Sequence, residues 1–207
     1  MTNTSVPYEY IRSKLKDCNP VNISNKSGAC YDGEKQELYV KLMGKRYIVQ
    51  YPSGYVYHED YSEVDQFVMK TLILRYLINA KGMPATGKEI NYKDVPGGQV
   101  YYRNFHGRCI MRLARTFGGN IPAFEEAMEK LNGTKNGYGD ISYRFQFLNN
   151  IYITFILWKG DDEFPPSANI LFDENVPYYF DAEDLAVVGD ISIGCLRKLI
   201  SPIVDKL

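Results

Sequence analysis

Side chains able to act as a base, a nucleophile or a metal ligand are sparse in this chain. His58 and His106 are its two histidines, so a Ser–His–Asp or Cys–His nucleophile system would have to use one of them. His106 falls on the apolar side of a helix expected over residues 104–117. This position favours a core or boundary histidine with a hydrogen-bonded ring, and the alternative is a metal-ligating imidazole. His58 follows an expected strand and precedes two acids, which indicates a solvated turn. Neither G-x-S-x-G nor H-E-x-x-H occurs.

Carboxylates gather after the most apolar segment of the chain, residues 151–158. Asp161, Asp162 and Glu163 are consecutive there, and such a group can bind a hard cation or do acid–base work. Consecutive side chains on a loop do not converge by default, so a metal or catalytic site needs a further partner. Asp173, at the end of the next expected strand, is the candidate. A solvated acidic loop is the alternative, and the favoured one.

A phosphate-loop pattern occurs at residues 82–88, which match G-x-x-x-x-G-K. In a phosphate loop, backbone N–H groups and the lysine surround the phosphates, and a following hydroxyl holds magnesium. Here Glu89 replaces that hydroxyl. The segment also runs from an expected helix into an expected strand, whereas a phosphate loop runs from strand to helix. We therefore expect a helix end followed by a turn.

Arginines form a stripe on the helix expected over residues 104–117. Arg108, Arg112 and Arg115 share one face of it, and Arg103 precedes it. Such a stripe can hold a phosphate or a carboxylate. More commonly it is a solvated face that pairs with local acids, and this is the favoured interpretation.

Aromatic content is the unusual feature of the composition, with 18 Tyr, 10 Phe and 1 Trp, 14% of the chain. Tyrosine favours strands, so the simplest interpretation is a tyrosine-rich sheet surface. Because its ring is apolar and its hydroxyl polar, the alternative is a flat wall for a planar ligand.

The elements that must position these residues come in blocks. Strands separated by turns are expected at 38–42, 47–51 and 55–57, after a loop at 18–33. A capping box of Ser62 and Asp65 is expected to open a central helix. Further expected elements are an extended segment at 100–102, helices at 104–117 and from 122, strands at 141–147, 151–158 and 168–172, and helices from 181 and over 190–206. Because strands and helices come in blocks and do not strictly alternate, we predict an α+β fold. We expect a single domain over residues 1–207, with a mainly antiparallel sheet and helices packed on it.

Charge and cysteine usage exclude several classes of protein. Lys+Arg 24 against Asp+Glu 25 gives a net charge of −1, which argues against a general electrostatic grip on nucleic acid. Cys18, Cys30, Cys109 and Cys195 form no C-x-x-C pair, so we expect neither a zinc ribbon nor an iron–sulfur cluster. Neither a signal peptide nor a run of 18 apolar residues is found. These features predict a reduced, cytoplasmic protein with free thiols and no membrane association.

Ordered motifs over residues 7–200 resemble domain-of-unknown-function family 3786. The motifs that carry the resemblance are Tyr51-Pro52-Ser53-Gly54, Leu74-Arg75-Tyr76-Leu77-Ile78-Asn79-Ala80, Val95-Pro96-Gly97-Gly98, Tyr101-Tyr102, Phe117-Gly118-Gly119, Trp158-Lys159-Gly160-Asp161-Asp162-Glu163-Phe164-Pro165, Leu171-Phe172-Asp173 and Glu183-Asp184-Leu185. The family has no settled activity. The resemblance implies an anaerobic bacterium or archaeon and the company of corrinoid-dependent methyl-transfer proteins. Longer members carry a four-cysteine iron–sulfur module, which this chain lacks.

The leading hypothesis is therefore a non-catalytic protein that binds a corrinoid (cobalamin) or a related tetrapyrrole in an anaerobic methyl-transfer or redox system. The expected pocket wall consists of Tyr101, Tyr102, Phe105, His106 and Trp158, with Arg103 and Arg108 meeting polar side arms of the ligand. The common corrinoid signature D-x-H-x-x-G is absent, so His106, a water or no protein group would face the cobalt. One alternative is a carboxylate-site enzyme, metal-assisted, at Asp161, Asp162, Glu163 and Asp173. The other is a ligand-free adaptor that docks through the acidic loop or the arginine stripe.

Overall fold

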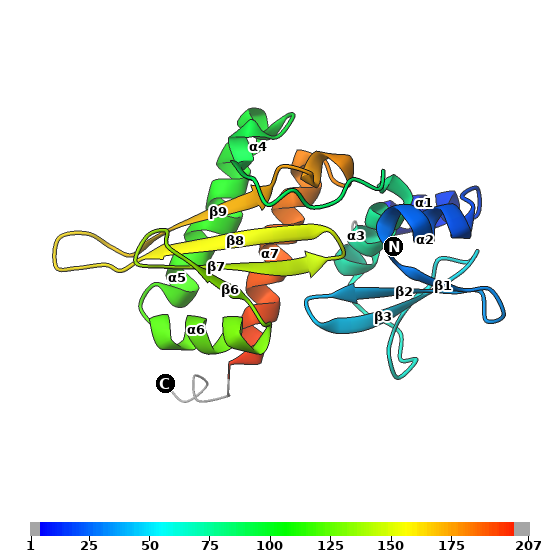
Figure 1. Ribbon diagram of the computed structural model, residues 1–207, viewed down its shortest axis with the longest axis horizontal. Helices are drawn as coiled ribbons and strands as arrows, with labels where there is room; N and C mark the ends of the chain where they lie inside the picture. Colours follow the sequence, from blue (N-terminus) through cyan, green and yellow to red (C-terminus); the bar gives the residue numbers. More distant parts are fainter. Residues whose placement is uncertain (1–4, 201–207) are drawn as a thin grey trace.

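The computed structural model describes residues 5–200, which form two antiparallel sheets with helices around them (Figure 1). The first half contains, in order, α1 (Ser5–Leu15), α2 (Pro20–Ser27), β1 (Cys30–Asp32), β2 (Glu37–Leu42), β3 (Lys45–Gln50), β4 (Val56–His58) and α3 (Phe67–Asn79). The second half contains β5 (Glu89–Asn91), α4 (Gly98–Phe105), a π-helical segment (His106–Ile110), α5 (Met111–Phe117), α6 (Ile121–Lys130), β6 (Thr134–Asn136), β7 (Ile141–Leu148), β8 (Ile151–Trp158), β9 (Ser167–Asp173) and α7 (Ala182–Leu199). Short 3-10 turns lie at Tyr92–Asp94 and Val176–Tyr178.

The first sheet has the strand order β1-β2-β3-β4. Its β2–β3 hairpin turns at Met43 and Gly44, whose φ angles are 45° and 80°. Positive φ at both turn residues matches the twist of the flanking strands, which explains the tight hairpin. Leu38, Val40 and Leu42 alternate toward the core along β2, so the residues between them lie on the outer face.

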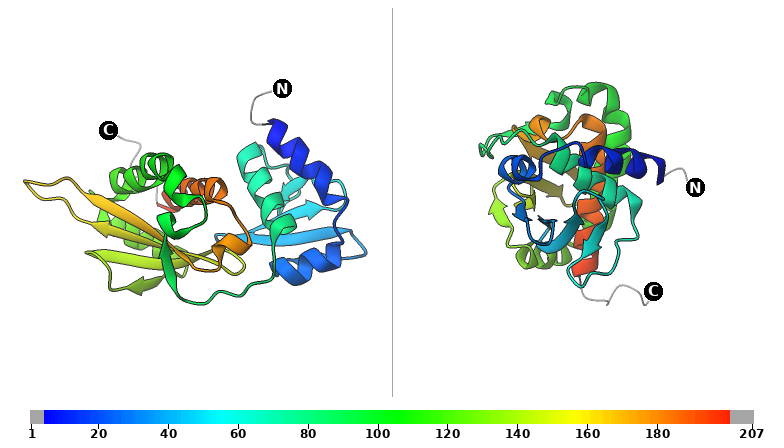
Figure 2. Two further views of the ribbon diagram at one scale, coloured as in Figure 1. Left: turned by 90° about the horizontal axis from the view of Figure 1, so that it is seen from above. Right: turned by 90° about the vertical axis from the view of Figure 1, so that its right-hand side faces the viewer.

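The second sheet has the strand order β5-β9-β8-β7-β6. Buried residues alternate along β7, at Ile141, Tyr143, Phe145 and Phe147, as the sequence pattern predicts. Helices α5, α6 and α7 cover the face of the sheet to which these residues belong (Figure 2). The β7–β8 turn contains Asn150 at a φ of 61°, which confirms the tight turn expected there.

The two sheets share one contiguous hydrophobic core. Helix α3 contributes buried side chains to it, and the hydroxyl of Tyr76 donates to the carbonyl of Asn149 at 2.8 Å. The Met43 N–H donates to the Phe147 carbonyl at 2.8 Å, so the β2–β3 hairpin meets β7 directly. The α+β prediction is confirmed, and the strands divide into two sheets rather than one.

Three local predictions are wrong. The segment expected to be a loop from residue 18 contains α2, because Asn19 accepts hydrogen bonds from two helical N–H groups and Pro20 fits the first turn. Ser62 does not open α3, which begins at Phe67. The Ser62 hydroxyl donates to Asp60 instead, and Glu63 forms a β-bridge with Tyr57. Residues 100–102 are helical, within α4, rather than extended.

The last helix is continuous where two were expected. The side chain of Asp181 caps α7 by accepting a hydrogen bond from the Asp184 N–H at 2.8 Å. The expected helical continuation beyond residue 200, to Lys206, lies outside the described residues. Within residues 5–200, no helix has both the length and the apolar character needed to cross a membrane.

Candidate functional site

The candidate site lies beside a long helix whose middle is π-helical. Helix α4 runs into the π-helical segment His106–Ile110 and then into α5 without a break. The N–H of Met111 bonds to the carbonyl of His106, five residues earlier. Such π segments disrupt the regular hydrogen-bond ladder, and they are frequent at functional sites. His106 is the first residue of this segment, so its side chain leaves the helix where the ladder changes.

A hollow of about 400 Å³ opens between this helix, the end of β5 and the strands β8 and β9. Four of the seven expected binding residues line it: Tyr102, Phe105, His106 and Trp158. The other residues of its wall are Asn91, Tyr92, Lys93, Asp94, Ile110, Ala168 and Asn169. The volume lies within the usual range of small-molecule sites, roughly 300–1,000 Å³.

Phe105 and Tyr92 form the aromatic floor of the hollow. Phe105 is fully buried, and its ring stacks on that of Tyr92 with centroids 3.8 Å apart and an interplanar angle of 4°. The Tyr92 hydroxyl donates to the carbonyl of Ala182 at the start of α7. Burial raises the pKa of this hydroxyl, so it remains a neutral donor. Tyr92 was missed at the sequence level, because nothing local shows that the 3-10 turn after β5 folds over α4.

His106 is a half-buried polar side chain of the hollow. Its ring lies 5.7 Å from that of Tyr102 at an angle of 49°, and it makes no hydrogen bond or ion pair with any residue in 5–200. His106 is half-buried, as expected for a boundary histidine, but its ring does not form the expected hydrogen bond with any residue in 5–200. Lys93 also contacts Tyr102, with its Nζ 4.1 Å from the ring centroid, and brings a positive charge to the rim.

Tyr101, Arg103 and Arg108 do not join the other four residues. Tyr101 packs against the hydrophobic core, and Arg103 is exposed to solvent. Arg108 donates to Asp190 of α7 at 3.3 Å. The physical reason is helical phase: the segment is helical from Gly98, and each residue turns the side-chain direction by about 100°. Residues three or four apart therefore share a face, as Tyr102 does with Phe105 and His106, and the neighbours of Tyr102 on either side point elsewhere.

The arginine stripe pairs with an acid of the same protein. Arg108 and Arg112 both bond to the carboxylate of Asp190, and Arg112 also donates to its carbonyl at 3.1 Å. Arg115 is exposed. The favoured interpretation of the stripe as a face paired with local acids is confirmed for Arg108 and Arg112.

The four carboxylates proposed as a metal or enzyme site are not brought together. Asp161, Asp162 and Glu163 lie in the β8–β9 turn, beyond the pair Trp158 and Ser167. Asp173 ends β9 at the opposite end of the same antiparallel pair. Seven residues of strand lie between the turn and that end, a separation of roughly 20 Å. Among residues 5–200 no group of three His, Cys, Asp or Glu side chains is arranged to hold a metal ion.

Asp173 instead anchors the segment that resembles a phosphate loop. Its buried carboxylate accepts hydrogen bonds from the backbone N–H groups of Thr86 and Gly87, at 3.0 and 2.8 Å, and from Arg144 at 2.7 Å. Burial alone would raise the pKa of Asp173, but these hydrogen bonds outweigh it and hold the pKa below the usual value. The amide groups of the loop thus bind a carboxylate of the protein itself, in agreement with the expectation that residues 82–88 are not a nucleotide site.

The family assignment rests on most of the chain. No curated protein and no solved structure matches the chain. The sequence profile described as Domain of unknown function (DUF3786) matches residues 19–194, a span that contains both sheets and the hollow at His106. The chain therefore belongs to the DUF3786 family.

Proposed function

We propose that this chain is a non-catalytic cofactor-binding protein whose ligand is a corrinoid or a related tetrapyrrole. The observation that carries the proposal is the convergence of Tyr102, Phe105, His106 and Trp158, from a helix and a strand distant in sequence, on one hollow. The family resemblance supplies the ligand class and an anaerobic methyl-transfer or redox system as the setting. Its compartment would be the cytoplasm, in accord with four free thiols.

The residues that line the hollow fit one face of a corrin ring, which is a large, partly apolar disc. Tyr102 and Trp158, the partly exposed aromatic side chains of the wall, offer surface for the ring above the buried pair Tyr92 and Phe105. The unpaired imidazole of His106 could face the metal, since a neutral imidazole nitrogen is the commonest protein ligand of a metal. Asn169 donates from Nδ2 to Oδ1 of Asn91 at 3.5 Å, and the remaining donors and acceptors of these two amides could bond to amide side arms of the ligand. The hollow is open, so the opposite side of the disc would face solvent or a partner protein.

The test is a titration of the purified, oxygen-free protein with hydroxocobalamin and with cob(II)alamin, followed by the visible spectrum. A corrinoid-binding protein is expected to shift the spectrum and to co-elute with the ligand on gel filtration. His106→Ala is expected to remove or alter the spectral shift. His58→Ala, which changes the other histidine in a different hollow, serves as the matched control and is expected to bind as the unaltered protein does.

Absence of both spectral shift and co-elution in the unaltered protein would refute corrinoid binding. Binding with the same spectrum in His106→Ala would show that the imidazole does not face the cobalt. Tyr102→Ala then tests the aromatic wall itself. Loss of the stacking surface is expected to weaken binding about tenfold, because an aromatic contact contributes roughly 0.5–1.5 kcal/mol beyond its buried area.

A ligand-free adaptor is the second candidate function, and one observation favours it. The β8–β9 hairpin projects from the body of the molecule, and Phe164 at its tip is 67% exposed (Figure 1). Asp161 holds the turn in shape by accepting from the N–H groups of Glu163 and Phe164. An exposed aromatic ring on a fixed turn suits docking. A photo-crosslinking residue at position 164 should capture one recurring protein that the same residue at exposed Lys35 does not, and equal capture at both positions would reject this role.

A further inference from the structure

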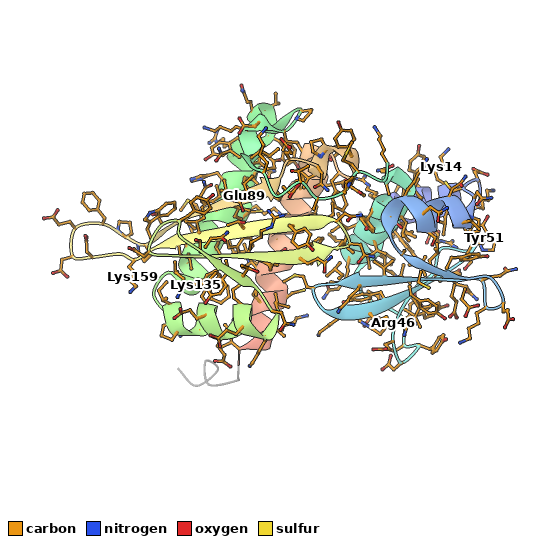
Figure 3. The ribbon with its side chains drawn as sticks, in the orientation of Figure 1. Lys14, Arg46, Tyr51, Glu89, Lys135 and Lys159 are labelled. Carbon is orange, nitrogen blue, oxygen red and sulfur yellow. The ribbon has the colours of Figure 1, made fainter. Side chains whose placement is uncertain are left out.

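A second hollow, of about 830 Å³, lies on the first sheet and is distinct from the one at His106. It is bounded by β2 and β3 and by the turn that follows β4. Figure 3 shows Arg46 on β3, at the end of the molecule away from Lys159 and the projecting hairpin. The two hollows share no lining residue, so a variant in the wall of one leaves the wall of the other unaltered.

Positive charge concentrates on the strand side of this hollow. Lys41 of β2 and Arg46 of β3 are direct partners in the antiparallel ladder, so their side chains leave the same face of the sheet. Like charges directly opposite one another destabilise a sheet. Lys45, at the start of β3, pairs with Leu42 in the ladder, so its side chain leaves the opposite face of the sheet, on the side of Cys195. A pair of like charges in this position costs stability, and a bound anion would offset that cost.

The acids of the hollow compensate this charge only weakly. Glu59 lies 3.8 Å from Arg46, and both side chains are about half exposed or more, so their attraction is screened by solvent. The carboxylate of Asp60 accepts hydrogen bonds from the N–H and the hydroxyl of Ser62, at 2.9 and 2.5 Å, and these bonds lower the pKa of Asp60. The Lys41 side chain forms no ion pair or hydrogen bond with any residue in the described part of the chain.

The arginine is already oriented for binding. The Arg46 guanidinium carbon lies 4.1 Å from the centroid of the Tyr39 ring, so the ring supports one face of the guanidinium group. Tyr39 is itself held by a hydrogen bond from its hydroxyl to Glu37 at 2.7 Å. An arginine fixed in this way loses less side-chain freedom on binding, and its planar donors match the oxygens of a phosphate.

From this arrangement we propose that the hollow on β2 and β3 binds a phosphorylated small molecule of nucleotide size. Lys41 and Arg46 would hold its phosphate groups, since two adjacent cations match a group with two negative charges better than a single carboxylate. The volume lies in the upper part of the range for small-molecule sites, larger than one phosphate needs. Glu59, across the hollow, would accept from hydroxyl or amino groups of the same ligand.

Calorimetric titration with ADP, inorganic pyrophosphate and adenosine tests the proposal. ADP and pyrophosphate are expected to bind, more weakly as salt is raised, and adenosine is expected not to bind. Lys41→Gln and Arg46→Gln should each lower the affinity for ADP at least about tenfold, because each removes a charge-assisted contact. Lys35→Gln, a change at an exposed lysine in the β1–β2 turn of the same sheet, is the matched control and should bind ADP as before.

A charge reversal separates binding from folding. Lys41→Glu replaces a repulsive pair with an attractive one opposite Arg46, so the free protein should have an unchanged or higher Tm while losing ADP binding. Failure of both ADP and pyrophosphate to bind, or equal binding by Lys41→Gln and the unaltered protein, would overturn the proposal. Much tighter binding of a short single-stranded oligonucleotide than of ADP would overturn it in favour of a nucleic-acid surface.

Discussion

Arg75 of α3 donates from Nη1 to Oδ1 of Asp184 in α7 at 2.5 Å, and this ion pair joins the helix of the first half of the chain to the last helix. The side chain of Asp184 is only 4% exposed, whereas that of Arg75 is 30% exposed. Burial raises the pKa of Asp184 to about 6, although the charge of Arg75 acts in the opposite direction. The junction between the two helices therefore holds a carboxyl group that is costly to ionise.

The first prediction concerns how stability depends on pH at this junction. An unfolded aspartate has a pKa of about 3.9, so between that value and about 6 the folded chain holds a proton on Asp184 that the unfolded chain has released. Stability from this group is therefore fully present below the unfolded pKa and is lost as the pH rises through 6. The slope for one proton is about 1.4 kcal/mol per pH unit.

Asp184→Asn removes this titration. The free energy of unfolding of the variant, measured by urea denaturation from pH 4 to pH 7, should therefore lack the decline that Asp184 causes in the unaltered protein. Asp162→Asn, which changes an exposed acid in the β8–β9 turn, should keep the decline. A pH profile of Asp184→Asn parallel to that of the unaltered protein would show that Asp184 ionises normally in the fold.

The second prediction concerns Asp173. Asp173→Ala leaves Arg144 and the N–H groups of Thr86 and Gly87 without their shared acceptor. Removal of one member of a buried charged network costs about 3–5 kcal/mol of unfolding free energy. Asp173→Asn should cost less, because an amide oxygen still accepts from the loop. A loss below about 0.5 kcal/mol, the usual effect of a surface change, would mean that the anchor is dispensable.

Asp173→Ala should also release residues 82–88. Limited proteolysis is expected to cut the variant after Lys88 faster than the unaltered protein, because two backbone hydrogen bonds of this segment depend on Asp173. Cleavage after Lys35, in the distant β1–β2 turn, should proceed at the same rate in both proteins. An unchanged rate at Lys88 would indicate that other contacts hold the loop.

The third prediction compares two glycines of the helix beside the candidate site. A Cβ at Gly98 would lie 1.9 Å from the carbonyl oxygen of Tyr92, so Gly98→Ala forces α4 away from the aromatic floor of the hollow. A Cβ at Gly107, in the π-helical segment, would meet nothing within 4 Å. Gly107→Ala should leave stability unchanged or raise it by up to about 1 kcal/mol, because alanine favours helix over glycine.

Melting temperatures and near-ultraviolet circular dichroism measure this contrast. Gly98→Ala is expected to lower Tm and to change the tyrosine signal, since the ring of Tyr92 stacks on that of Phe105 in α4. Gly107→Ala should do neither. Equal Tm values for the two variants would contradict the close approach of α4 to Tyr92.

Much of the secondary structure follows from neighbours in sequence. The alternation along residues 141–147, the turn at Asn150 and the helix opened by Asp181 were all predictable, because periodicity and capping involve residues only a few positions apart. The errors at Ser62 and at residues 100–102 arose where a side chain or a backbone group found a partner that the local pattern did not reveal. Ser62 bonds to Asp60, and Gly98 packs on the backbone of Tyr92.

For the candidate site, residue types alone identified Tyr102, Phe105, His106 and Trp158 and failed for Tyr101, Arg103 and Arg108. The two groups differ because the helix begins at Gly98, six residues before the start expected from the pattern. Residues 101 and 103 are therefore helical, and their side chains point in other directions than that of Tyr102. Tyr92 could not be predicted as a wall of the hollow, because its contact with Phe105 depends on how the turn after β5 folds over α4.

The amino-acid sequence by itself determined the α+β class, the hairpins and the family, since each depends on local pattern or on ordered motifs. Only the tertiary structure decided which side chains share a site. Asp173 and Asp161 lie apart because they are at opposite ends of one antiparallel strand pair. Arg108 forms its ion pair with Asp190, which is 82 positions away in the sequence. Such pairings depend on strand direction and helix phase across the whole molecule, and no short segment of sequence contains that information.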